Sequence, residues 1–246
     1  MSLEIIPVEI NKDVEQHDNI IELIMSSSSK PEIKDDDILV FTQKIISKQE
    51  GNLINLPSIT PSLLAVGIAS AYDKDPRVVE VILSQSKQIV RMNDGVLITE
   101  TTQGFICANA GVDESNVKNG YVTLLPKNAD ATAKKLKDQV FQKMGKDVVV
   151  LISDTFGRPF REGQTNCAIG IAGISAITDY VGTKDTFGKT LHVSAIAVAD
   201  EICSAAELVM GKALNTPIAI VRNYKYRRSD SLAKDMIRLK PADLFR

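Results

Sequence analysis

One run of residues constrains the fold of this chain more than any other. The segment from Val148 to Ser153 reads VVVLIS, with no polar residue before its last position. A strand with one exposed face alternates apolar and polar side chains, whereas a fully apolar run is typical of a strand buried on both faces. We therefore expect this segment to be a strand inside the core.

Other segments predict strands and helices in mixed order. From Ala129 to Met144 the apolar residues recur at helical spacing, and Gly145 follows as a stop. The turn Asn93-Asp94-Gly95 between two apolar runs indicates a hairpin. Further strands are expected at 3–8, 37–42, 105–110, 121–125, 191–199 and 217–221, and further helices at 19–26, 61–72, 76–86, after Asp200 and near 232–238.

The order of these elements predicts an α+β (mixed α/β) fold with mixed sheets and hairpins, because strands and helices do not alternate strictly. Residues 154–164 are polar and are expected to form a loop, and residues 167–177 do not distinguish helix from strand. We expect a single domain over residues 1–246, with a soft subdivision near residue 128.

Charge and composition exclude several classes of protein. A net charge of −2 argues against binding to nucleic acid or an anionic membrane through bulk charge, and no apolar run is long enough for a membrane span. Three scattered cysteines form no disulfide framework and favour a cytoplasmic location. With only two histidines, the chemistry must depend on carboxylates, Lys/Arg, hydroxyls and bound ions, and phosphoryl transfer suits that set.

The strongest chemical motif follows the buried strand, in the run SDTFGRPFREG from Ser153 to Gly163. The Asp154 carboxylate beside the Thr155 hydroxyl suits Mg²⁺, which prefers oxygen ligands. Arg158 and Arg161 have the forked geometry that grips an anionic group. The alternative, a strand ending in an Asp turn with two solvated arginines, has about even odds on the residues alone.

Three weaker segments carry similar residue types. The turn NAGVDESN offers Asp113 and Asn116 to a metal or nucleotide, although a simple Asx turn is favoured when it stands alone. Lys48 follows a buried strand and is a possible charge for phosphates, but the segment is no Walker A loop and an exposed lysine is favoured. Asp200 is expected to be an N-cap, and Met210-Gly211-Lys212 either presents amides to phosphate or is an ordinary C-cap.

The basic stretch from Arg222 to Arg228 contains two interleaved tyrosines, a pattern that also occurs in RNA-binding segments. With a net charge of −2 and few aromatic residues, a solvated face is favoured, and a grip on an anionic substrate or a neighbouring subunit is the second interpretation.

Four runs, taken in order, resemble one known family, the coenzyme F420:L-glutamate ligases, also called gamma-glutamyl ligases. The runs are ILVFTQKIISKQEG (38–51), ANAGVDESNV (108–117), SDTFGRPFREGQTNCAIGIAG (153–173) and ADEICSAAELVMGK (199–212). The resemblance implies a GTP-dependent ligase that adds L-glutamate to a deazaflavin coenzyme F420 precursor, first through an amide and then by gamma-linkage. It also implies Mg²⁺ or Mn²⁺ at two sites, K⁺ as a helper, and an intertwined homodimer of that family's fold.

The same resemblance assigns roles residue by residue. Asp113 and Asp154 correspond to metal ligands, with Thr155 at a second metal. The positions that correspond to nucleotide contacts are Asn11, Lys12, Asp13, Val14, Gln43, Lys44, Lys48, Asn116, Met210 and Gly211. The family's Gly-Leu-Pro pattern is absent from the segment 11–14. Lys212 stands where the family has a Glu at the second metal, so either that metal has fewer protein ligands or Lys212 neutralises phosphate directly.

Arg158 and Arg161 are our hypothesis for catalytic contacts to the substrate phosphodiester or to the incoming glutamate, because they lie close in sequence to Asp154. Two alternatives to the ligase remain at this stage. One is another nucleotide-dependent amide ligase or phosphotransferase on the same scaffold, and the other is a non-catalytic nucleotide- or coenzyme-binding protein.

Overall fold

The computed structural model describes residues 2–27 and 32–243, and its largest element is a five-stranded sheet. In spatial order the strands are β1 (Glu4–Val8), β12 (Ile218–Arg222), β2 (Ile38–Thr42), β8 (Val149–Arg158) and β9 (Arg161–Ala172). β2 and β8 are parallel, and the other neighbouring pairs are antiparallel. This mixed sheet is consistent with the α+β class expected from the sequence.

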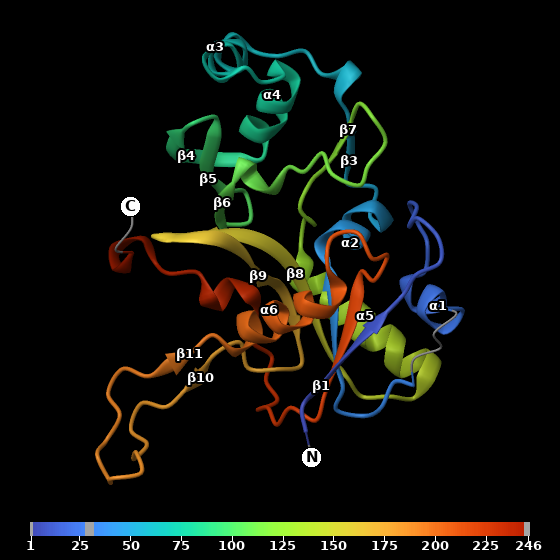
Figure 1. Ribbon diagram of the computed structural model, residues 1–246, viewed down its shortest axis with the longest axis vertical. Coiled ribbons are helices and arrows are strands. Elements are labelled where there is room, and N and C mark those ends of the chain that lie inside the picture. Colours follow the sequence, from blue (N-terminus) through green and yellow to red (C-terminus); the bar gives the residue numbers. More distant parts are fainter. Residues whose placement is uncertain (1, 28–31, 244–246) are drawn as a thin grey trace.

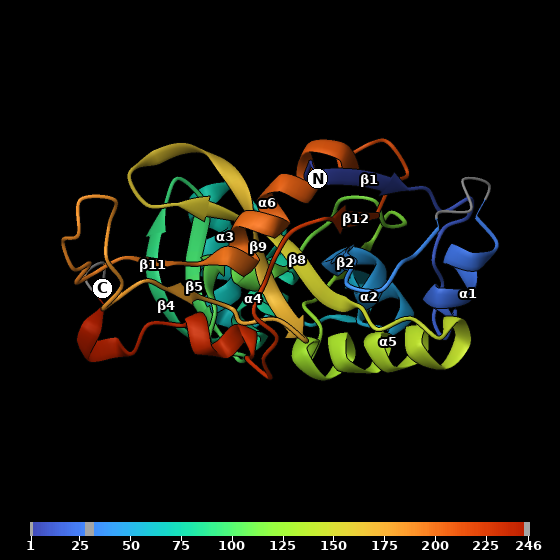
Figure 2. The ribbon, with the colours of Figure 1, turned by 90° about the horizontal axis from the view of Figure 1, so that it is seen from below.

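Helices cover both faces of the sheet (Figures 1 and 2). α5 (Ala129–Met144) packs on one face together with α1 (Ile20–Met25) and α2 (Gln43–Gln49), and α6 (Val198–Met210) packs on the other. Successive residues of β2 and β8 point alternately into these two cores, which explains why the run 148–153 has no polar face. Among the described residues, no helix is both long and apolar enough to cross a membrane.

Residues 53–123 form a second unit with a hydrophobic core of its own, at the top of Figure 1. Its elements are β3 (Leu53–Asn55), η1 (Leu56–Ser58), α3 (Leu63–Tyr72), α4 (Pro76–Ser84), β4 (Ser86–Asn93), β5 (Val96–Thr101), β6 (Ile106–Ala108), η2 (Asn109–Gly111) and β7 (Tyr121–Thr123). The chain leaves the main sheet after α2 and rejoins it through α5. The subdivision expected near residue 128 stays a prediction.

The remaining elements lie beyond β9. A long arm (residues 178–196) carries β10 (Thr178–Asp179) and β11 (Ala195–Ile196) and extends away from the sheet (Figure 1). Two 3-10 turns, η3 (Ala233–Met236) and η4 (Lys240–Ala242), follow β12. The helix predicted near 232–238 is therefore wrong, because the segment forms only a single 3-10 turn there.

The loop predicted at 154–164 is also wrong. β8 continues to Arg158 and β9 begins at Arg161, so the segment is a long hairpin that turns at Pro159-Phe160. The backbone N–H and C=O groups of this part of β8 form their hydrogen bonds with β9. Such pairing does not depend on the polarity of the side chains. The undecided segment from residue 167 onward is strand as far as Ala172.

The start of α6 differs from the prediction as well. The strand expected at 191–199 is wrong beyond Ala195–Ile196, since α6 begins at Val198. Asp200 is therefore not the N-cap. It lies in the first helical turn, where its carboxylate accepts a hydrogen bond of 2.8 Å from the backbone N–H of Ala168 on β9.

The basic stretch after β12 makes ion pairs within the chain. Arg222 donates two hydrogen bonds, of 2.8 and 2.7 Å, to the buried carboxylate of Asp37. Arg228 pairs with Asp36 and Asp147 at 2.5 Å each. These contacts hold the C-terminal segment against the turns that precede β2 and β8.

Candidate active site

The site begins where the two parallel strands of the main sheet reach the same edge. Thr42 at the end of β2 lies opposite Ser153 of β8. α2 starts at the next residue on one strand, and Asp154 is the next residue on the other. β2 ends here while β8 continues to Arg158, so the start of α2 lies beside Asp154.

Asp113 reaches this edge from the second unit through a tight turn. Asn109, Ala110 and Gly111 all have positive φ, and a Cβ at Gly111 would lie 2.6 Å from Leu125 Cγ. Only glycine fits that position. The backbone of Asp113 then pairs with Thr123 in both directions, at 3.1 and 2.9 Å, which fixes the direction of its side chain.

The Asp113 carboxylate is held by cationic and neutral donors. Lys44 Nζ on α2 donates to Asp113 Oδ2 at 2.5 Å and to the Ser115 carbonyl at 2.8 Å, and the Ser115 N–H donates to Asp113 Oδ1 at 2.7 Å. Burial opposes ionisation of Asp113, but the hydrogen bonds from Lys44 and Ser115 outweigh it and hold the pKa of the carboxyl below its ordinary value. Asp113 is therefore an anion at neutral pH.

Asp154 is partly buried and has the opposite shift. Burial, followed by the charge of Asp113, raises the pKa of Asp154 to about 6, while the charges of Lys212 and Lys44 act in the other direction. Asp113, Lys44 and Lys212 are thus close enough to Asp154 for their charges to act on it, so four separate segments bring charged side chains to one region. A cation bound between Asp113 and Asp154 would interact favourably with both carboxylates.

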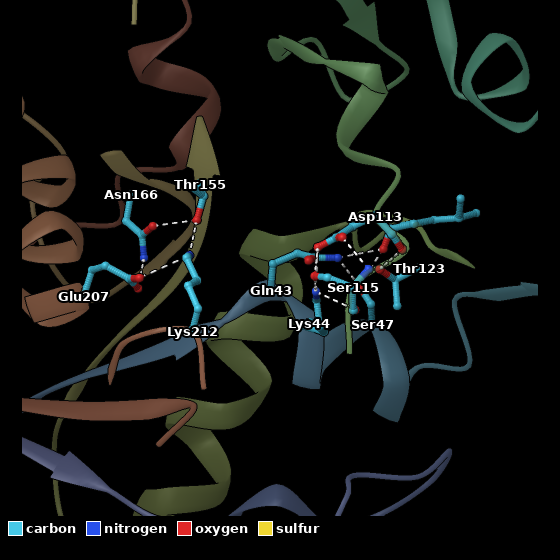
Figure 3. Close-up of polar contacts among 11 residues, drawn as sticks. Gln43, Lys44, Ser47, Asp113, Ser115, Thr123, Thr155, Asn166, Glu207 and Lys212 are labelled. Atoms are coloured by element: carbon cyan, nitrogen blue, oxygen red, sulfur yellow. Dashed lines mark hydrogen bonds and ion pairs between the residues drawn. The ribbon is translucent and has the colours of Figure 1, made fainter. Parts of the chain in front are cut away.

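A second polar cluster, formed around Lys212, lies apart from the cluster around Asp113 (Figure 3) and includes Thr155, the residue after Asp154. Lys212 Nζ donates to Thr155 Oγ1 at 2.6 Å and pairs with Glu207 Oε1 at 3.1 Å. Asn166 lies across the β8–β9 hairpin from Thr155. Its Oδ1 accepts from the Thr155 hydroxyl at 2.8 Å, and its Nδ2 donates to Glu207 at 3.0 Å.

Two of the three predicted nucleotide contacts on α2, Gln43 and Lys48, are buried. Lys48 has a side chain that is 9% exposed, and its Nζ pairs at 2.5 Å with Asp13 of the loop before α1. Gln43 donates to Ser47 Oγ at 2.6 Å and to the Leu124 carbonyl at 2.8 Å, which anchors α2 to the strand segment after β7. The structure thus joins Lys48 to the predicted 11–14 loop.

The other predicted nucleotide positions differ in orientation. Asn11, Lys12 and Asn116 are exposed, with Lys12 paired to Asp18 at 2.8 Å. Val14 and Met210 are buried in the core, so their side chains are not available to a nucleotide and only their backbones could contact one. Gly211 ends α6 with φ +58°, and its N–H donates to the Glu207 carbonyl at 3.1 Å.

Arg158 and Arg161 lie at the tip of the β8–β9 hairpin, four and seven residues beyond Asp154. Arg158 donates to the carbonyls of Glu162 and Gly163 in its own turn, and Arg161 is exposed. None of the contacts that the structure gives these two arginines joins them to Asp113 or Asp154. Their catalytic role stays a prediction.

Two cysteines lie near Asp154. Burial and then the negative charge of Asp154 raise the pKa of Cys107 to about 12. Burial, Asp200 and Asp154 raise the pKa of Cys167 to about 12. Both thiols stay protonated at neutral pH and are poor nucleophiles and poor metal ligands.

The donors present suit a hard divalent cation. Asp113 and Asp154 contribute carboxylate oxygens, and the charge of Asp113 adds to burial in opposing the charge of Asp154, so a bound cation would stabilise the ionised form of Asp154. Within residues 2–27 and 32–243, no three or more His, Cys, Asp or Glu side chains are grouped around one point. An ion bound to this pair would take its other ligands from water or substrate phosphates, as Mg²⁺ commonly does.

Three residues of the site were not identified from the sequence. Ser115 completes the bonds to Asp113, and Asn166 and Glu207 complete the cluster around Lys212. Asn166 could have been found from its place opposite Thr155 in the β8–β9 hairpin. The polar composition of residues 154–164 conceals that hairpin in the sequence.

Comparison with known proteins gives consistent matches. The family model described as F420-0:Gamma-glutamyl ligase matches residues 10–223. The chain is 43% identical to the coenzyme F420:L-glutamate ligase of Methanothermobacter thermautotrophicus, over the whole of both chains. It is 45% identical to the protein of that name from Methanocaldococcus jannaschii, over 87% of this chain and 86% of the relative. The Methanopyrus kandleri relative of the same name is 42% identical over 100% of this chain and 98% of its own.

Proposed function

The chain belongs to the F420-0:gamma-glutamyl ligase family, and from that premise we propose that it joins L-glutamate to a coenzyme F420 precursor in a reaction driven by GTP. The observation that carries the proposal is the convergence of Asp113 and Asp154 with Lys44 and Lys212 at one edge of the main sheet. Two carboxylates and two ammonium groups in one region suit the handling of phosphates and a divalent ion.

The chemistry explains why a nucleotide is needed. Condensing a carboxylate with an amine in water is unfavourable, so the carboxylate must first be activated. In the proposed route GTP phosphorylates the carboxylate of the precursor to an acyl phosphate and releases GDP. The amine of L-glutamate then attacks the acyl carbon and displaces phosphate. The further gamma-linked glutamates expected from the sequence would form in the same way.

In this proposal Asp113 and Asp154 hold Mg²⁺ or Mn²⁺. When bound, the ion neutralises charge on the transferring phosphoryl group. The tight turn at residues 109–111 and the hydrogen bond from the Ser115 N–H orient Asp113 before any substrate arrives. A preoriented carboxylate needs little rearrangement when the ion binds. K⁺ as a helper ion rests on the sequence resemblance alone.

Lys44 and Lys48 are the proposed cationic contacts to the nucleotide. Each is paired with a carboxylate at 2.5 Å, Lys44 with Asp113 and Lys48 with Asp13. An incoming triphosphate would compete with those carboxylates for the ammonium groups, and ion binding at Asp113 would release Lys44. The segment 11–14, Asn116 and the backbone at Met210-Gly211 are the remaining proposed contacts.

We also place Arg158 and Arg161 in the proposal, as contacts to the precursor's phosphodiester or to glutamate. Both lie at the tip of the β8–β9 hairpin, on the strands that carry Asp154 and its cross-strand neighbours. A homodimer is part of the proposal as well, on the strength of the family resemblance.

An assay of product formation tests the proposed function. The protein is incubated with GTP, Mg²⁺ or Mn²⁺, L-glutamate and the deazaflavin precursor, and the products are analysed by mass spectrometry and nucleotide chromatography. We expect GDP, phosphate and a product that is heavier by one or more glutamate residues. GTP consumption that does not depend on the deazaflavin would instead indicate another ligase or phosphotransferase, and binding without any turnover would indicate a non-catalytic protein.

A further inference from the structure

The contacts of Lys212 suggest a role beyond that of a surface lysine. Its ammonium donates to Thr155 Oγ1 at 2.6 Å and pairs with Glu207 at 3.1 Å, and its charge acts on Asp154. An ordinary lysine–glutamate pair on an exposed helix end contributes little and is loosely held. The additional bond to Thr155, next to Asp154, is what makes this lysine part of the site.

The residues that hold Lys212 are themselves fixed. Asn166 is only 3% exposed, and its side-chain amide joins Thr155 to Glu207. Because the Thr155 hydroxyl donates its proton to Asn166 Oδ1, its lone pairs are left to face the Lys212 ammonium. One carboxylate oxygen of Glu207 accepts a hydrogen bond from the Asn166 amide, and the other pairs with the Lys212 ammonium. These contacts arrange the oxygens of Thr155 and Glu207 to bind one positive charge.

The same acceptors would otherwise suit a divalent ion. Mg²⁺ binds hydroxyl and carboxylate oxygens at about 2.0–2.1 Å. The ammonium already lies 2.6 Å from Thr155 Oγ1, so an ion bound to that oxygen and the Lys212 nitrogen would overlap. A charged ammonium cannot ligate a metal, since it has no lone pair. One cation or the other therefore occupies the position.

We propose that the Lys212 ammonium is a built-in cation of this site, held by Thr155 and Glu207 in the position beside Asp154 that a second divalent ion would otherwise take. The inference rests on the proposed function, because it assigns a charge to the same phosphate-handling site. It predicts a site with one exchangeable divalent ion per chain, held by Asp113 and Asp154, and with the second positive charge supplied by the protein.

Lys44 differs from Lys212, because it cannot keep its present partner when the exchangeable ion is bound. Its acceptor is Asp113, one of the two proposed ligands of the exchangeable ion, so Lys44 must leave that carboxylate when the ion binds. Lys212 is paired with Glu207, which is not one of those ligands, so its contacts are compatible with an ion between Asp113 and Asp154.

Counting bound Mn²⁺ tests the inference. The intact protein is equilibrated with Mn²⁺ and a non-hydrolysable GTP analogue, and bound ions per chain are measured by equilibrium dialysis and electron paramagnetic resonance. We expect one ion for the wild type and two for Lys212→Glu, whose carboxylate would join Thr155 and Glu207 as a ligand. Lys134→Met, which removes a lysine paired with Asp138 on the exposed face of α5, is the control and should leave the count at one.

Two ions, or none, on the wild-type chain would overturn the inference without requiring any variant to fold. A folded Lys212→Glu variant that still binds one ion would also overturn it. The outcome is separate from that of the proposed function, since the count uses a nucleotide that does not react. Wild-type protein that binds one ion but makes no glutamylated product would refute the ligase and leave the assignment of Lys212 standing.

Discussion

Asp154 carries a charge that its surroundings oppose, and this has a measurable consequence for stability. Its pKa is raised to about 6 from an ordinary value of 3.8, mainly by burial. The folded protein therefore loses stability as pH rises from about 4 through 6, where the carboxyl ionises in the folded state at a cost that the unfolded chain does not have. The site keeps an unfavourable charge that a bound cation would neutralise.

We therefore expect Asp154→Asn to raise the melting temperature at pH 7.5 in metal-free buffer while abolishing turnover. The shift in pKa corresponds to an upper bound of roughly 3 kcal/mol, reduced by the part of the side chain that meets solvent. At pH 4 the two proteins should melt alike, because wild-type Asp154 is then protonated when folded. A lower melting temperature for the variant at pH 7.5 would contradict the account.

Asp113→Asn is the matched comparison, since the pKa of Asp113 is shifted the other way. A lowered pKa contributes stability at neutral pH that is lost as pH falls through the folded pKa. We expect this variant to melt below the wild type at pH 7.5, with a difference that shrinks in acid. Thermal unfolding followed by circular dichroism over the pH range separates the two carboxyls.

Lys48 gives a further prediction at this scale, because its ammonium pairs with Asp13 and is proposed to contact a nucleotide. Lys48→Met should weaken binding of a GTP analogue by roughly tenfold, the order expected for losing one charge-assisted hydrogen bond. Asp13→Asn should tighten binding, since it removes the competing carboxylate. Calorimetric titration measures both, and Lys143→Met, which removes an ion pair between α5 and Glu22 of α1, should bind as the wild type does.

At the scale of elements, the packing of β9 against α5 depends on one glycine. A Cβ at Gly170 would lie 2.5 Å from the carbonyl oxygen of Ala129 at the start of α5. Asp130 in the same turn accepts a hydrogen bond of 2.8 Å from the Ile171 N–H, so helix and strand cannot easily separate. This contact fixes the strand that lies opposite Asp154 and Thr155.

Gly170→Ala should therefore destabilise the protein by about 1–3 kcal/mol, the range for overpacking a tight contact. Gly157→Ala on the same hairpin is the control, because a Cβ there meets nothing within 4 Å and no positive φ is involved. Chemical denaturation of both variants measures the difference. Equal stability of the two variants would show that β9 can move away from α5 at no cost.

The sequence was informative where local chemistry decides the structure. The helix at Ala129–Met144 was predicted with the bounds the structure gives it, because its apolar spacing and Gly145 are local signals. The hairpin at 158–161 was missed since its stability comes from pairing between strands, which polar side chains do not reveal. Asn166 and Glu207 were missed because their roles depend on contacts between segments far apart in the sequence. Asp154 was singled out as a carboxylate after a buried strand, whereas the role of Asp113 came from the family resemblance.

At the scale of the whole molecule, the arm at residues 178–196 extends from the sheet with large apolar side chains exposed. Phe187 is 89% exposed and Val193 is 90% exposed. Exposed apolar side chains on an extended arm are typical of surfaces that meet another subunit. This observation supports the proposed homodimer.

We expect sedimentation to show a dimer for the wild type and a shift toward monomer for the double variant Phe187→Ser, Val193→Ser. Phe141→Ser removes an exposed aromatic residue from α5 and should leave the assembly unchanged. A wild-type chain that sediments as a monomer at micromolar concentration would remove the dimer from the account.

The central claim is that two carboxylates from separate units of the chain hold one divalent ion. Calorimetric titration of Mn²⁺ into the wild type, Asp113→Asn, Asp154→Asn and the control Glu114→Gln tests it most directly. We predict at least a tenfold loss of Mn²⁺ affinity in each aspartate variant and wild-type affinity in the control, whose exposed carboxylate is adjacent to Asp113. Wild-type Mn²⁺ affinity in either aspartate variant would show that the two side chains do not share an ion.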